Sequence, residues 1–135
     1  MTYEQFNQFC GAFAGTSYVQ QWGGAHVWKV GGVAGGENSN RAAPGVAGKV
    51  FAIGGWQQDD KVAFTFKTSE ADFSLLQSVP GFRPAPYMAS RGMSWIQIHD
   101  IDIVPDEEIK RNISESYRIV AAGLTKKLQR DLGLL

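Results

Sequence analysis

Four β-rich segments follow one another before the chain reaches its second helix, and this order restricts the fold more than any other feature. They are a hairpin at 17–30, which supplies two strands, and single strands at 49–56 and 61–67. Gly23 and Gly24 provide the positive φ angles that a tight hairpin turn of two residues needs. Because no strand–helix–strand repeat occurs until late in the chain, the sequence predicts an α+β domain with mainly antiparallel strands.

Alternation of apolar and polar residues shows how this sheet is oriented. Two segments, 61–67 and a fifth strand at 95–99, carry the pattern. Their apolar members are Val62, Phe64, Phe66, Ile96 and Ile98. Since only one face of each strand is apolar, we expect helices on that face alone. The prediction is a two-layer sandwich: a five-stranded, mainly antiparallel sheet with helices packed on one face, and the other face open to water or a partner.

The helices are marked by their first residues. Thr2 and Gln5 have capping-box spacing at the start of a helix that reaches about Cys10. Ser69 opens the second helix, and three acids after Pro105 open the longest one. Its apolar stripe comprises Ile109, Ile113, Tyr117, Val120 and Leu124. A last short helix is expected after Thr125.

Composition limits the class of protein. The 135 residues fit one domain, interrupted by a glycine-rich segment at about 31–48 that predicts a mobile loop. Lys plus Arg equals Asp plus Glu, 13 of each, so no overall positive field draws the protein to nucleic acid or to a membrane. The single cysteine, Cys10, excludes a disulfide framework and suits a reducing compartment. With no signal peptide or membrane span in the sequence, we expect a cytoplasmic protein.

Three stretches of the chain resemble the MmcQ/YjbR family of small bacterial proteins. They are "FCGAFAGTSYVQQWGGAHVWKV", "FTFKTSEADFSLLQSVPGFRPAPYMASRGMSWIQI" and "ISESYRIVAAGLTKKLQRDLGL". The resemblance implies a fold similar to CyaY and frataxin, and it implies DNA binding, the role by which the family is labelled. The glycine-rich stretch departs from the family pattern, in which the strand pair is joined tightly.

Cations and aromatic rings near the expected open face form the candidate site. DNA binding needs cations that reach phosphates and rings that stack on bases. Strand alternation places Trp95, Gln97 and His99 on the open face with the polar residues of 61–67. The candidate residues are Lys29, Lys67, Arg83, Tyr87, Arg91 and Trp95, with Lys126 and Lys127 in the last helix. In this hypothesis Lys29, Lys67, Arg83 and Arg91 contact phosphates, and Trp95 or Tyr87 stacks.

Ordinary structural roles compete with this hypothesis. Exposed sheet faces are usually polar, and lysines in a terminal helix suit the helix dipole without any partner. A protein-interaction module could use the same face. The frataxin likeness raises small-ligand or metal binding through the acids of 100–108, although those after Pro105 are better explained as first-turn helix residues. No catalytic motif is found. We therefore expect a protein that is not an enzyme and needs no cofactor. We also expect it to be a monomer or a weak homodimer.

Overall fold

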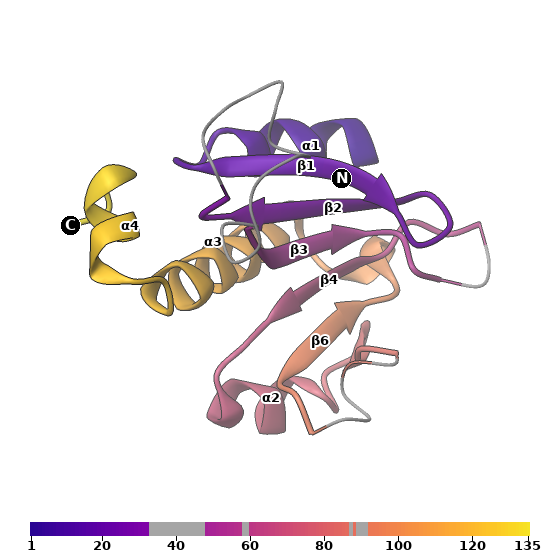
Figure 1. Ribbon diagram of the computed structural model, residues 1–135. Helices are drawn as coiled ribbons and strands as arrows, with labels where there is room; N and C mark the ends of the chain where they lie inside the picture. The colour runs from indigo at the N-terminus through magenta and orange to yellow at the C-terminus, as the bar shows by residue number, and fades with distance from the viewer. Residues whose placement is uncertain (33–47, 58–59, 87, 89–91) are drawn as a thin grey trace.

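The computed structural model describes residues 1–32, 48–57, 60–86, 88 and 92–135 (Figure 1). In chain order the elements are α1 (Tyr3–Gly11), β1 (Thr16–Gln21), β2 (Ala25–Val30), β3 (Lys49–Gly54), β4 (Phe64–Lys67), α2 (Glu70–Leu76), β5 (Phe82–Pro84), β6 (Trp95–Ile98), the 3₁₀ helix η3 (Ile101–Ile103), α3 (Asp106–Ala122) and α4 (Lys126–Asp131). Most of the predicted glycine-rich loop, residues 33–47, lies outside the described residues.

All six strands form one antiparallel sheet in the order β1-β2-β3-β4-β6-β5. The α+β class is confirmed, but the predicted number of five strands is wrong. The additional strand, β5, pairs with β6 at the edge of the sheet. Its Pro84 has no backbone N–H, which an edge strand tolerates because one of its sides has no neighbour. Three residues are too few to show a period-two pattern, so the sequence predicts only a connection there.

The main core lies between the sheet and two helices on the same face. In Figure 1, α3 passes behind the sheet and α4 lies beyond one end of it. The ring of Phe6 in α1 stacks on Phe64 of β4 with centroids 4.7 Å apart. The ring of Tyr117 in α3 stacks on Phe13, just after α1, at 4.5 Å. Phe64, Phe66, Ile96 and Ile98 belong to this core, so the predicted orientation of their strands is correct.

A serine of α3 closes a gap in the sheet. The register between β2 and β3 shifts at Trp28 and Lys29, opposite Phe51, which marks a bulge. The pairing of β3 with β4 stops at Ala52. Beyond this point the buried Ser116 hydroxyl donates to the Phe51 carbonyl oxygen at 2.6 Å and accepts from the Lys67 N–H at 2.8 Å. The side chain of a helix thus replaces a missing rung of the strand ladder.

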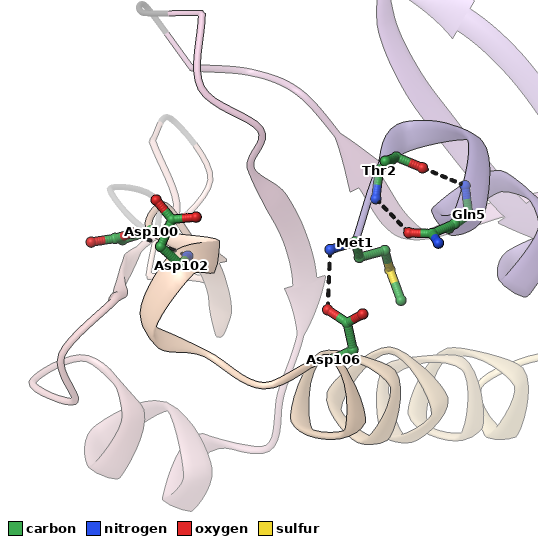
Figure 2. Close-up of polar contacts among 6 residues, drawn as sticks. All are labelled: Met1, Thr2, Gln5, Asp100, Asp102 and Asp106. Atoms are coloured by element: carbon green, nitrogen blue, oxygen red, sulfur yellow. Dashed lines mark hydrogen bonds and ion pairs between the residues drawn. The ribbon is translucent and has the colours of Figure 1, made fainter.

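Polar contacts position the starts of α1 and α3 (Figure 2). Thr2 and Gln5 form the predicted capping box: the Gln5 N–H donates to the Thr2 hydroxyl, and the Thr2 N–H donates to the Gln5 side chain. The Met1 ammonium lies 3.1 Å from a carboxylate oxygen of Asp106, in the first turn of α3. Asp100 caps η3 by accepting from the Asp102 N–H at 3.2 Å. These acids have local structural partners.

The second face of the sheet is covered near its centre, in contrast to the open face that the sequence predicts. Ala25, Val27 and Ile53 form a small buried cluster, against which Trp56 and Met88 pack. The two covering residues come from the connections that follow β3 and β5. Alternation identifies the side of the sheet on which a side chain lies, but it gives no sign of whether a distant loop lies over that side.

Trp95 is buried although it lies on the face of the sheet that the sequence predicts to be open. Because Ile96 and Ile98 face the helices, Trp95 lies on the other face as expected. Its side chain is nevertheless only 4% exposed, and Gln97 beside it is fully buried. No residue of the described chain accepts a hydrogen bond from the Trp95 indole nitrogen. The prediction that Trp95 and Gln97 are accessible to a partner is therefore wrong.

No helix within the described residues has the length and apolar character needed to cross a membrane.

Replacing Ser116 with Ala should destabilise the fold. The change removes both hydrogen bonds of the hydroxyl and leaves the Lys67 N–H without its acceptor, which costs about 1–3 kcal/mol. Ser114→Ala is the matched control, because that hydroxyl bonds only within its own exposed helical turn, and we expect it to change stability by less than about 0.5 kcal/mol. Urea unfolding of both variants measures the difference. Equal stabilities would contradict the bridging role of Ser116.

Cys10 should resist thiol reagents while the protein is folded. Its side chain is fully buried, and burial raises the pKa of the thiol far above its usual range, which disfavours the reactive thiolate. A colorimetric disulfide reagent at pH 8 should label one thiol per chain in denaturant and almost none in native buffer. Rapid labelling of the native protein would show that Cys10 is accessible.

Candidate functional site

Three predicted phosphate-contacting cations lie on the second face of the sheet but are spread across it. Lys29 is in β2, Lys67 in β4 and Arg83 in β5, and all three are half-buried. Lys29 and Lys67 are separated by β3, so their backbones lie about 10 Å apart at ordinary strand spacing. Arg83 is a further two strands away at the opposite edge from β1. The structure does not gather these cations into one cluster.

The other predicted residues divide into two groups. Tyr87 and Arg91 lie outside the described residues. Lys126 and Lys127 are exposed on α4, and the Lys127 ammonium lies 3.7 Å from Asp131 one turn later. In Figure 1, α4 and the turn between β1 and β2 lie at opposite ends of the molecule. The α4 lysines therefore belong to a different surface from that turn.

A cleft of about 1210 Å³ lies at the end of the sheet near the β1–β2 turn. Its walls come from that turn, the end of β3, the residues after β3, β5 and the residues after β6. Its lining includes rings and cations suited to recognition, namely Trp22, Trp56, His26, His99, Lys61 and Arg83, together with Tyr3 and the acids Asp60 and Asp100. Among the predicted binding residues that the structure describes, Arg83 is the one that lines this cleft.

Two tryptophans stack at the cleft. The rings of Trp22 and Trp56 have centroids 5.1 Å apart and planes 26° apart. Trp22 is 49% exposed, so much of its surface remains accessible to a second ring. In the described part of the chain these are the two non-glycine residues with positive φ, 54° for Trp22 and 68° for Trp56. Such backbone conformations cost about 1–3 kcal/mol each and often occur at functional sites.

Local sequence accounts for both strained positions. Gln21 is the last residue of β1 to pair with β2, opposite Ala25, so the turn contains Trp22, Gly23 and Gly24. This turn is one residue longer than predicted, and all three residues have positive φ. Trp56 likewise follows a glycine with positive φ, Gly55. The two turns bring the tryptophans together although they are far apart in the sequence.

Arg83 is held in the cleft wall by neutral groups. Its Nε and one terminal nitrogen donate to the Gln97 side-chain oxygen at 2.8 and 2.6 Å, and that terminal nitrogen also donates to Gln57 at 3.4 Å. Gln97 is itself fixed, because it is fully buried and its side-chain nitrogen donates to the Trp56 carbonyl oxygen at 3.2 Å. Among the described residues, no carboxylate forms an ion pair with Arg83. Within the described chain the side-chain partners of this guanidinium are therefore neutral amides.

His26 lines the cleft and also contacts residues of α1. Its Nδ1 lies 2.7 Å from the Tyr18 hydroxyl and 3.5 Å from the Asn7 amide nitrogen. Asn7 in turn accepts from the Trp28 indole at 2.9 Å. The ring of Tyr3 packs on His26 with centroids 4.9 Å apart. These contacts restrain the His26 ring in the cleft wall.

The residues that the structure describes contain no cluster of three or more histidine, cysteine or acidic side chains that could hold a metal ion. Three of the five acids between residues 100 and 108 have other partners. Asp100 caps η3, Asp106 pairs with the Met1 ammonium, and Glu108 pairs with Arg111 at 3.2 Å. No group of these side chains supports the metal-binding alternative.

Sequence reasoning misses the tryptophan pair, although a signal for it is present. Trp22 stands directly before the glycine pair at 23–24, and Trp56 stands directly after a second pair at 54–55. A large aromatic residue beside two glycines at the end of a strand indicates a turn that displays a ring. The sequence does not show that these two turns meet.

Known proteins share both the sequence pattern and the fold. The YjbR family model matches residues 11–119. The crystal structure of the Deinococcus radiodurans protein DR2400, described as a DUF419 domain, has a TM-score of 0.77 at 17% identity, covering 99% of this chain and 89% of that chain. A Pseudomonas syringae protein has a TM-score of 0.63 at 17% identity, covering 89% of this chain and 99% of that one.

At these identities the two crystal structures show the fold alone. No curated protein sequence matches the chain. The family match spans most of the sequence, from the end of α1 to near the end of α3, and confirms the resemblance seen in the sequence. The chain belongs to the YjbR family.

Proposed function

We propose that this protein binds nucleic acid, DNA in the first instance, through the cleft at the end of the sheet and without catalysing a reaction. The observation that carries the proposal is the stacked pair of Trp22 and Trp56 at the cleft, with the guanidinium of Arg83 in the same wall, which has no ion-pair partner among the described residues. Aromatic rings that accept bases and cations that contact phosphates are the two elements that such binding requires.

The proposed contacts differ from those expected from sequence. Trp22 takes the stacking role that the sequence gives to Trp95, because Trp22 is half exposed and Trp95 is buried. Arg83 keeps its role as a phosphate contact, since the fork of a guanidinium suits phosphate oxygens and Gln97 holds it in position. Lys29 and Lys67 do not line the cleft.

The burial of Cys10 supports binding without catalysis. A cysteine nucleophile needs an accessible thiolate, whereas Cys10 is buried in the main core and its pKa is raised by that burial. His26 has structural partners in Tyr18 and Asn7. We therefore assign the cleft a recognition role and no reaction.

Arg83→Gln should weaken DNA binding roughly 10- to 100-fold, because a hydrogen bond to a charged group contributes about 1.5–3 kcal/mol. Fluorescence anisotropy with labelled mixed-sequence oligonucleotides, single-stranded and duplex, at 50 mM NaCl measures the affinity. The control is the double variant Lys126→Ala and Lys127→Ala, which removes two exposed cations of α4 and should leave the affinity within about twofold, since α4 is remote from the cleft.

Two results would contradict the assignment of DNA binding to the cleft. Equal loss of affinity in the α4 variant would indicate a diffuse contact with exposed cations. No binding of either oligonucleotide by the unchanged protein would overturn the nucleic-acid function itself and favour a protein partner at this surface. Thermal melting followed by circular dichroism shows whether each variant is folded, so that a loss of affinity caused by unfolding can be recognised.

A further inference from the structure

We propose that the cleft selects an unpaired nucleotide strand over a duplex. This inference rests on the proposed nucleic-acid function and names the form of nucleic acid that fits: a strand whose bases have free faces and whose backbone makes few charged contacts. Three features of the cleft carry it, namely the exposed tryptophan ring, the balance of charges in the wall, and the fixed position of Arg83.

The first feature is the exposed ring of Trp22. Its partner Trp56 packs on the buried cluster of the second sheet face, so the pair is supported from the protein side. A base can stack on Trp22 only if one of its own faces is free. In a duplex both faces of an internal base are covered by its neighbours, and freeing one costs unstacking energy. An unpaired strand avoids this cost.

The second feature is the charge balance of the cleft. Lys61 and Arg83 line the wall together with Asp60 and Asp100, and the whole chain has a net charge of zero. Duplex DNA carries a phosphate charge about every 1.7 Å along its axis, and proteins that bind it present a basic stripe. Among the lining residues that the structure describes, two cations offset by two acids provide no such stripe. The attraction must therefore come mainly from stacking, which favours single strands.

The third feature is the restraint on Arg83. Its contacts to Gln97 and Gln57 use Nε and one terminal nitrogen, and within the described chain the other terminal nitrogen, Nη1, has no acceptor. Because the Gln97 amide also binds the Trp56 carbonyl, the guanidinium and the tryptophan pair are connected through one buried side chain. A cation restrained in this way suits one phosphate at a set distance from the stacked base.

The size of the cleft favours a strand over a free nucleotide. Its volume of about 1210 Å³ exceeds the range of about 300–1,000 Å³ usual for small-molecule pockets. One mononucleotide would leave much of this space to water. A short single strand can place one base on Trp22 and extend along the rest of the cleft.

The experiment compares three probes by anisotropy and competition: a labelled mixed-sequence single strand of 12 nucleotides, the same sequence as a duplex, and unlabelled nucleoside monophosphate or inorganic phosphate as competitors. The single strand should bind at least about tenfold more tightly than the duplex. Raising NaCl from 50 to 200 mM should lower its affinity only about three- to sevenfold, as expected for one or two phosphate contacts. The monophosphate should compete weakly, and inorganic phosphate more weakly still.

Trp22→Gly tests the stacking contact directly. Glycine accepts the positive φ of this turn, and the position is on the surface, so the variant should fold. We expect single-strand affinity to fall about tenfold while duplex affinity stays unchanged. Leu75→Ala, which removes an exposed apolar side chain from α2, outside the cleft lining, is the control and should change neither.

The outcomes separate this inference from the proposed function. Equal or tighter binding of the duplex, or a fall in affinity of a hundredfold or more over the same change in salt, would overturn strand selection while leaving nucleic-acid binding in place. Tighter binding of the monophosphate than of the strand would replace the strand with a small nucleotide as the ligand. Absence of binding to every probe would remove the proposed function and the inference together.

Discussion

The buried amide of Gln97 connects the sheet to the cleft, and the arrangement of the candidate site depends on it. Its oxygen accepts from Arg83 of β5, and its nitrogen donates to the carbonyl of Trp56 beyond β3. A fully buried amide with both ends bonded is favourable only while each partner stays in place. The edge strand β5 and the turn after β3 are thus held in one relative position, and with them the guanidinium and the tryptophan stack.

Much of the fold could be predicted because its main signals are local. The capping box at Thr2, the glycine pair of the hairpin and the alternating apolar residues of β4 and β6 each act within a few residues. Together with the order of the segments, they determine the α+β class and the face on which helices pack. The three residues of β5 carry no periodic pattern, so no local signal predicts this strand, and only its pairing with β6 defines it.

The site was harder to predict because its geometry is created by contacts between distant segments. Alternation places Trp95 on the correct side of the sheet, yet the burial of Trp95 depends on connections that cover that side. The sequence shows that Arg83 is a cation, but the absence of an acidic partner among the described residues becomes visible only in three dimensions. Trp22 and Trp56 are adjacent in space because two separate turns meet.

The hydroxyl of Ser116 has a consequence for how α3 can move. Since it bonds to backbone atoms of β3 and β4 at once, it fixes the helix along its own axis as well as against the sheet. Sliding α3 by one turn, about 5.4 Å, would break both hydrogen bonds of Ser116 and bring Asn112 or Val120 to this position, and valine can satisfy neither backbone group. Rearrangements of this protein on binding should therefore occur in the turns around the cleft, with α3 and the central strands moving as one rigid unit.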